Sequence, residues 1–155
     1  MAIATLSAGC FWGVEARFRQ LTGVLSTRVG YTAGTTIDPT YESICTGVTG
    51  HAEAIEITFD ETVISFEDLL NSFWHLHDPT TLNRQGPDIG TQYRSAIFYH
   101  DEQQEIIAQR SKQALDQSGY FPNPIITEIT AISTFYPAEE YHQCYLEKKG
   151  LGSCH

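Results

Sequence analysis

The order of strand and helix patterns constrains this chain more than any other feature of its sequence. Apolar residues at alternate positions predict a strand, and apolar residues three or four positions apart predict a helix. The leading patterns are a strand at 2–8, a helix from Cys10 to Gly23, strands at 24–31 and 51–59, a helix between Ser65 and Asp78, and a strand at 94–99. This β-α-β-β-α-β order is that of split-βαβ or ferredoxin-like folds. We therefore expect an α/β (α+β) fold, a two-layer α/β plait whose mixed sheet carries helices mainly on one face.

The remaining segments give weaker signals. Residues 32–50 are rich in Gly and Thr and predict a loop with one helical turn at 41–45. A helix from Asp101 to about Gln117, a strand at 125–132 and a long, largely irregular C-terminal segment with a helix-like charge pattern between Pro137 and Gly150 are expected to follow. Because 155 residues suit one domain and no linker interrupts them, we expect a single domain over 1–155 with a flexible tail at 149–155.

Charge and composition argue against several partners. The formal net charge is −10, and an acidic surface repels both nucleic acid and anionic membranes. No apolar run reaches the roughly 20 residues of a membrane helix, and the first ten residues lack the basic region of a secretory signal. Four cysteines at irregular spacing indicate reduced thiols rather than a disulfide framework, so we expect a cytoplasmic protein. Nothing in the sequence requires more than a monomer.

The motif G-C-F-W-G, from Gly9 to Gly13, places a cysteine where a strand gives way to a helix. Unpaired N–H groups and the positive end of the helix dipole favour a thiolate there, which lowers the pKa of the Cys10 thiol. The two glycines leave room for a substrate, and Phe11 and Trp12 flank the sulfur with apolar surface. The motif thus predicts a reactive cysteine, with a structural cysteine in an aromatic core as the alternative.

Glu53, in the motif G-H-A-E, falls within a predicted strand. Since side chains alternate along a strand, Glu53 shares a face with Ile55, Ile57 and Phe59, which we expect to be the core face. Burial raises the pKa of a carboxyl group, so Glu53 could keep its proton near neutral pH and donate it. The alternative is a glutamate at the end of the strand whose side chain reaches solvent.

Two further segments carry chemically useful side chains. The polar segment 84–95 contains Asp88 and Tyr93 and leads into a strand, and binding residues concentrate in such loops. The C-terminal tail contains Cys154 next to flexible glycines, which suits a thiol that moves toward a second sulfur. Read alone, the first is equally consistent with a surface loop, and the second with a disordered end bearing an incidental cysteine.

Together these motifs resemble one known family. G-C-F-W-G, then G-H-A-E, then R-Q-G-P-D-I-G-T-Q-Y-R-S and a glycine-flanked C-terminal cysteine occur in the order found in methionine sulfoxide reductase A. Each motif alone is weak, but the ordered set is specific and extends from about residue 3 to residue 154. The two-layer plait of that family agrees with the element order.

The resemblance implies a role for each matching residue. Cys10 would attack the sulfoxide sulfur of methionine-S-sulfoxide, free or in proteins, and become a sulfenic acid as methionine leaves. Glu53 would protonate the sulfoxide oxygen. The remaining matches form the expected substrate site: Phe11 and Trp12 around the methyl group, Tyr41 and Tyr93 at the oxygen, and Asp88 and Tyr145 as further contacts.

The resemblance also implies how the enzyme is recycled. Cys154 would condense with the sulfenic acid to give a Cys10–Cys154 disulfide, which thioredoxin, or dithiothreitol in vitro, would reduce. No bound cofactor or metal is implied. Cys144 falls inside the last helix-like pattern, away from the recycling position, and Cys45 is expected to be a small buried hydrophobic residue.

Three other readings compete with this one. A zinc site could be built from His142, Cys144, Cys154 and His155, but these residues match no common zinc spacing. A different thiol enzyme, such as a peroxidase, would share the cysteine without needing an aromatic pocket or a protonated glutamate. A plait used only for binding would not form a sulfenic acid at Cys10.

Overall fold

The computed structural model describes residues 2–145, and predictions that concern Met1 and residues 146–155 lie outside it. The described elements are β1 (Ala2–Ala8), α1 (Phe11–Arg19), β2 (Val24–Thr32), α2 (Tyr41–Cys45), β3 (Ala52–Phe59), α3 (Phe66–Leu76), β4 (Arg84–Gln85), β5 (Asp88–Ile89), the 3-10 helix η1 (Thr91–Tyr93), β6 (Ser95–Tyr99), α4 (Glu102–Ser118), β7 (Glu128–Ala131), β8 (Tyr136–Pro137) and the 3-10 helix η2 (Glu140–His142). Every strand and helix of the predicted β-α-β-β-α-β series is present.

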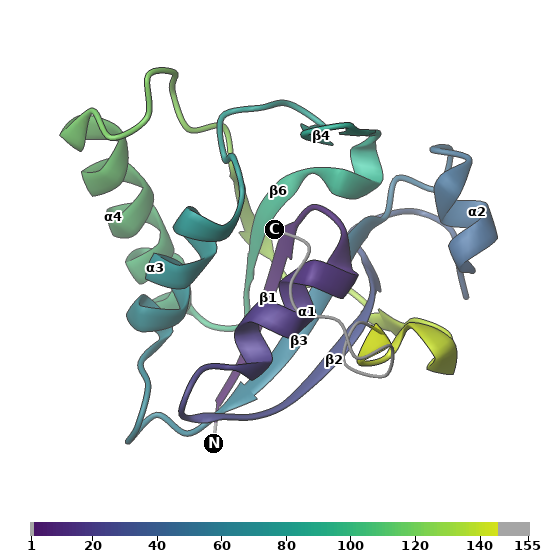
Figure 1. Ribbon diagram of the computed structural model, residues 1–155, viewed down its shortest axis with the longest axis horizontal. Coiled ribbons are helices and arrows are strands. Elements are labelled where there is room, and N and C mark those ends of the chain that lie inside the picture. The colour runs from purple at the N-terminus through teal and green to yellow at the C-terminus, as the bar shows by residue number, and fades with distance from the viewer. Residues whose placement is uncertain (1, 146–155) are drawn as a thin grey trace.

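The strands form a six-stranded mixed sheet in the order β7-β6-β1-β3-β2-β8, and β4 and β5 form a separate hairpin. Adjacent strands from β6 to β8 are antiparallel, whereas β7 runs parallel to β6. Leu6 lies opposite Ile55 on one side and Ile97 on the other. The predicted α/β fold with a mixed sheet and flanking helices is therefore confirmed (Figure 1).

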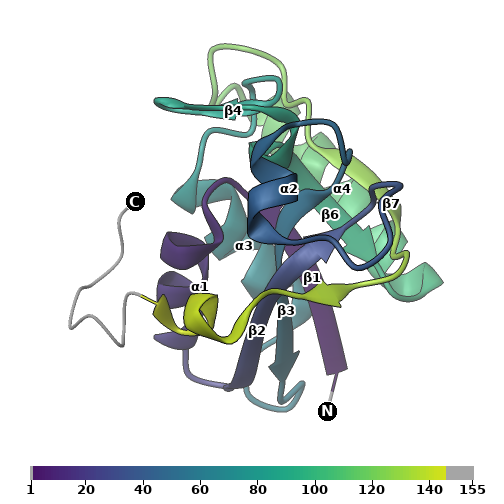
Figure 2. The same ribbon diagram turned by 90° about the vertical axis from the view of Figure 1, so that its right-hand side faces the viewer.

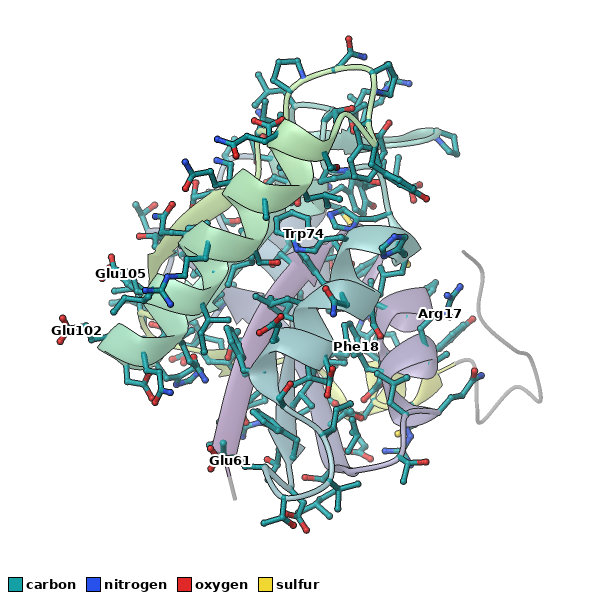
Figure 3. The ribbon with its side chains drawn as sticks, turned by 90° about the vertical axis from the view of Figure 1, so that its left-hand side faces the viewer. Arg17, Phe18, Glu61, Trp74, Glu102 and Glu105 are labelled. Atoms are coloured by element: carbon teal, nitrogen blue, oxygen red, sulfur yellow. The ribbon has the colours of Figure 1, made fainter. Side chains whose placement is uncertain are left out.

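The main core lies between the sheet and the helices α1 and α3. Along β1, Ala4, Leu6 and Ala8 point into this core and are at most 1% exposed. Figure 3 shows Phe18 turning inward from α1 while Arg17 turns outward. Trp74 of α3 donates its indole N–H to the hydroxyl of Ser111 in α4 at 2.7 Å, which joins the two helices. The core thus fixes α1 and the strand end from which it starts.

Helix α3 begins where the sequence predicts. The Ser65 hydroxyl accepts the N–H of Asp68 at 3.0 Å, and the Asp68 carboxylate accepts the N–H of Ser65 at 3.2 Å. This reciprocal capping satisfies two N–H groups that would otherwise lack partners.

The opposite face of the sheet is covered by the chain between β7 and β8. The Thr32 hydroxyl donates to the carbonyl of Thr134 at 2.9 Å, and Ile132 packs against the small cluster of Ala52, Ala96 and Phe98. Figure 2 shows the chain after β7 passing across the β2 edge and ending beside α1. The C-terminal segment is therefore brought next to the helix that begins after Cys10.

The helix predicted to start at Pro137 does not begin there, and residues 137–144 contain no α-helix. Pro137 belongs to β8 and pairs with Gly30, a 3-10 turn follows at 140–142, and helix is assigned only at Tyr145, the last described residue. Cys144, predicted to lie inside a helix, has a φ of +53°. Proline is tolerated on such an edge strand because it needs no N–H for the ladder.

Long-range contacts explain this departure from the local pattern. The side-chain amide of Gln143 accepts the N–H of Val29 and donates to its carbonyl, both at 2.9 Å, and also donates to Ala138. These bonds hold the segment along β2 and outweigh helix propensity, which is a weak preference for each residue. The tail predicted at 149–155 lies outside the described residues.

Replacing Gly30 by alanine should lower the free energy of unfolding by about 1–3 kcal/mol, because an added Cβ would overpack this contact. That atom would meet the carbonyl oxygen of Tyr136 and the ring of Phe135, leaving the covering segment no room. Chemical denaturation measures the loss. Leu25→Ala is the control, since Leu25 lies on the same strand and is 54% exposed. Equal stability of the Gly30→Ala and wild-type proteins would contradict the close packing.

Candidate active site

Cys10 lies at the N-cap of α1, directly after β1, and is half-buried. The preceding residue, Gly9, has a φ of +97°, a conformation open to glycine and rarely adopted by other residues. Gly9 thus allows the strand to turn sharply into the helix. The Cys10 carbonyl accepts the N–H of Val14 at 3.4 Å, which completes the first turn. The motif G-C-F-W-G therefore places Cys10 at the positive end of α1, as predicted.

Glu53 of β3 is a buried acid, with 1% of its surface exposed. It shares its side of the strand with Ile55 and Ile57, so the predicted orientation is confirmed. Its Oε1 accepts the N–H of Phe11, the first residue of α1, at 3.3 Å. Its Oε2 is buried and has no hydrogen-bond partner within residues 2–145. One oxygen thus ties the carboxyl group to the helix that starts at Cys10, and the other stays available.

The Glu53 carboxyl group is neutral near physiological pH. Burial raises its pKa to about 8, because a low-dielectric interior disfavours the charged form. The N–H of Phe11 acts against this rise in pKa, and the negative charge of Asp88 adds to it. A protonated carboxyl has one O–H donor, and because Oε1 already accepts a hydrogen bond, that donor is Oε2.

Tyr41, at the start of α2, and Tyr93, at the end of η1, lie near this acid. Burial raises the pKa of Tyr93 to about 12, and Glu53, Asp88 and Cys10 add to the rise electrostatically. Burial likewise raises the pKa of Tyr41, with further contributions from the neighbouring Cys45 thiol and from Glu53. Both hydroxyls therefore stay protonated. Since such effects fade with distance, they indicate that the acid, the cysteine and the tyrosines predicted at the site are neighbours.

An aromatic cluster flanks Cys10. The rings of Trp12 and Tyr145 are stacked, with centroids 3.9 Å apart, and Tyr41 lies 6.2 Å from Trp12. The indole N–H of Trp12 donates to Nδ1 of His142 at 2.8 Å. Phe11 is only 1% exposed, and its ring packs against His142 with centroids 5.3 Å apart. Trp12 and Tyr145 therefore form the accessible aromatic surface, whereas Phe11 supports it from below.

Sequence reasoning missed two residues of the C-terminal segment. The Glu139 carboxylate accepts the Tyr31 hydroxyl and the backbone N–H of Tyr41, both at 3.0 Å, and so fixes the start of α2. His142 is fully buried against Trp12, and burial lowers its pKa, which keeps its ring neutral and able to accept the indole hydrogen. The sequence indicates neither contact, because their partners lie roughly a hundred residues away.

The other cysteines occupy different environments. Cys45 is exposed on α2, so the prediction that it is buried is wrong; it is the last residue of a one-turn helix with a single buried position. Cys144 is half-buried beside α1. Cys154 lies outside the described residues. Across residues 2–145, no group of three potential ligands could hold a metal ion, and no described helix is long and apolar enough to cross a membrane.

Two cavities of the described surface lie away from this site. Cavities of about 530 and 500 Å³ lie beside α3 and α4, and Cys10, Glu53 and the predicted substrate residues do not line them. The Oε2 atom of Glu53 is buried within the described residues. A substrate oxygen that reaches the buried Oε2 of Glu53 must therefore displace side chains that now cover it.

The fold and these side chains are those of an oxidoreductase. The family model for peptide methionine sulfoxide reductase matches residues 2–155. Peptide methionine sulfoxide reductase MsrA of Methanothermobacter thermautotrophicus is 58% identical over 98% of this chain and 90% of its own length. The chain therefore belongs to the peptide methionine sulfoxide reductase MsrA family, and it is an enzyme of that family.

Solved structures of relatives agree with this assignment. The crystal structure of reduced Mxr1 from Saccharomyces cerevisiae matches with a TM-score of 0.91 and 38% identity, over 97% of this chain and 87% of that one. Mxr1 has also been solved in complex with Trx2, and that structure matches with a TM-score of 0.66 and 25% identity, over 93% of this chain and 84% of the other.

Proposed function

We propose that this enzyme reduces methionine-S-sulfoxide, free or within oxidised proteins, through attack by Cys10. The sulfur of Cys10 attacks the sulfoxide sulfur, the oxygen passes to Cys10 as a sulfenic acid, and methionine leaves. The sulfoxide gains the two electrons that the thiol loses. The observation that best supports this chemistry is the neutral, buried Glu53 tied to the first N–H of α1, with its second oxygen available to donate a proton.

In this proposal Glu53 protonates the sulfoxide oxygen, which makes it a better leaving group. The hydroxyls of Tyr41 and Tyr93 are un-ionised and add donors to the same oxygen. Trp12 offers apolar surface for the S-methyl group, with Phe11 beneath it.

Two further residues complete the proposed substrate site. Tyr145 covers the face of Trp12 and would contact the substrate from the C-terminal segment. Asp88 is half-buried and acts electrostatically on both Glu53 and Tyr93, so it lies where it can contribute to binding.

For recycling we assign Cys154 as the resolving cysteine. Its thiol attacks the sulfenic acid of Cys10, a disulfide forms, and the oxygen leaves as water. Tyr145 stacks on Trp12, two residues from Cys10, so the chain leading to Cys154 starts beside the nucleophile. The nine residues that follow can span at most about 30 Å, which is ample for this distance.

The disulfide would be reduced by a dithiol protein of the thioredoxin type. The complex of the yeast relative Mxr1 with Trx2 supports this partner. No disulfide links Cys10, Cys45 and Cys144 to one another, which fits the reducing cytoplasm in which we place the enzyme. We further classify the fold as a ferredoxin-like plait, since the central strands β6-β1-β3-β2 have the order that this fold requires.

Replacing Cys154 by serine should separate the two half-reactions. The variant should still release a single methionine per chain from the S epimer, because Cys10 and Glu53 are intact, but should not turn over with thioredoxin. Quantifying methionine after rapid mixing measures the first step, and thioredoxin oxidation measures the second. Cys45→Ser is the matched control and should cycle normally. Normal thioredoxin-dependent cycling of Cys154→Ser would overturn the assignment of Cys154.

A further inference from the structure

Glu15 is a second buried acid, located on α1 away from the proposed chemistry. It is 1% exposed and lies in the core-facing part of the helix, four residues after Phe11 and three before Phe18. A buried carboxyl is costly unless hydrogen bonds satisfy both of its oxygens. The identity of its partners therefore indicates what the residue does.

Every recorded partner of Glu15 donates a hydrogen to it. Oε1 accepts the backbone N–H of Cys144 at 2.6 Å, and Oε2 accepts the Thr27 hydroxyl at 2.7 Å. Thr27 in turn accepts a hydrogen bond from the Arg19 guanidinium at 3.2 Å, so its hydrogen is directed at Glu15. A group that only accepts is a carboxylate. Among these hydrogen-bonded groups, Glu15 carries a negative charge, and Arg19, two hydrogen bonds away, carries a positive one.

The thiol of Cys144 points at the same carboxylate, with its sulfur 3.9 Å from Oε2. Cys144 has a φ of +53°, which non-glycine residues adopt rarely, so the short bond from its N–H holds it in a strained position. A negative charge at that distance opposes the ionisation of a thiol, and the thiolate is the reactive form of cysteine. Cys144 is therefore kept as a hydrogen-bond donor.

The geometry points to Glu15 as a positioning residue that keeps Cys144 out of the resolving step and leaves the sulfenic acid of Cys10 to Cys154. This inference rests on the proposed function. Both thiols could in principle condense with the sulfenic acid, each reaction forming an S–S bond and releasing water. Helix α1 acts oppositely on the two thiols: its positive end lies at Cys10, whereas the carboxylate of Glu15 faces Cys144.

The reactivity of Cys144 tests whether the charge of Glu15 opposes ionisation of its thiol, and the test requires no turnover. In a protein carrying Cys10→Ser, Cys45→Ser and Cys154→Ser, the rate of alkylation by iodoacetamide is followed against pH. Its midpoint should lie above about 8.5, the value of an ordinary thiol. Adding Glu15→Gln, which keeps an oxygen for the Cys144 N–H, should lower the midpoint by about one unit or more. The rate at neutral pH should then rise roughly three-fold per unit, because the greater thiolate fraction outweighs its lower nucleophilicity.

Thr27→Val is the matched control. It removes one donor from Glu15 and disturbs the same contact, but it leaves the negative charge in place, so the midpoint should not fall. If Thr27→Val lowers the alkylation midpoint as much as Glu15→Gln does, then a loosened contact and not the charge of Glu15 sets the reactivity of Cys144. That result would overturn the inference. An ordinary midpoint in the protein with Glu15 intact would overturn it as well, even if Glu15→Gln fails to fold.

The disulfide partner of Cys10 is determined in the enzyme that keeps all four cysteines. After a single turnover with an S-epimer methyl sulfoxide, mass spectrometry should find Cys10 linked to Cys154 in the wild type and partly to Cys144 in Glu15→Gln. An unchanged linkage in Glu15→Gln would contradict the inference. Absence of methionine release from the wild type would instead refute the proposed function, and the alkylation result would stand unaffected.

Discussion

Replacing Cys10 by serine should abolish reduction of methionine-S-sulfoxide down to the background of a reaction without enzyme. A hydroxyl at this position is a far weaker nucleophile than a thiolate, and the positive end of α1 is not enough to ionise it. Release of methionine in a single turnover measures the effect. The loss should be complete because, among the described cysteines, Cys10 alone lies at the N-terminal end of α1.

The control for this variant is Cys45→Ser, which changes an exposed thiol on α2 and should retain near-normal activity. Circular dichroism and thermal unfolding should show both variants folded, since serine closely resembles cysteine in size. Residual methionine release by Cys10→Ser above background would show that another group attacks the sulfoxide.

Replacing Glu53 by glutamine should slow the reductive step by roughly 10²–10⁴-fold, the usual contribution of general acid catalysis. The amide fits the same buried space and can still accept the N–H of Phe11, but it has no proton to transfer. Rapid mixing with the S epimer measures the step directly. Glu15→Gln is a matched control, because it also replaces a buried glutamate by glutamine, and it should leave this first step unchanged.

The rate of the reductive step should fall at high pH. The reaction needs protonated Glu53, whose pKa is raised to about 8, so the rate attributable to this group should be level below that pH and fall above it. The Glu53→Gln variant should lack this fall. A wild-type rate that declines already through pH 4–5, the range of an ordinary glutamate, would contradict the acid role.

Stability should follow the same titration. Because the folded-state pKa of Glu53 lies above its unfolded value, its contribution to stability is complete below the unfolded pKa of about 4.3 and is lost as the pH rises through about 8. Over this window the wild type should lose up to several kcal/mol, at about 1.4 kcal/mol per unit of pKa difference, relative to Glu53→Gln. Denaturant titration of both proteins across the window measures the difference.

The parts of this structure that could be predicted from sequence are those encoded locally. Alternation along β3 places Glu53 in the core, and the pairing of Ser65 with Asp68 marks the start of α3, because neighbouring residues alone decide both features. The glycines and aromatic residues around Cys10 likewise mark its site within a few positions.

The C-terminal segment could not be predicted in this way. Its path is set by Gln143 binding to Val29, 114 positions away, and by Glu139 binding to Tyr31, 108 positions away. Local charges near Pro137 indicate a helix, but these distant contacts give residues 136–142 an edge strand and a 3-10 turn instead. The burial of Glu15 could have been predicted, since it follows Phe11 by four positions on the apolar side of α1. Its contact with Cys144 could not, because no local pattern indicates it.

The central claim is that the thiol of Cys10 takes the oxygen of a sulfoxide with the help of the proton on Glu53. Its most direct test is a single turnover of the reduced wild-type enzyme with an S-epimer sulfoxide and no external reductant, followed by mass spectrometry of the peptides. We expect a single methionine per chain and a disulfide between Cys10 and Cys154. Methionine formed while Cys10 remains a thiol would contradict the account.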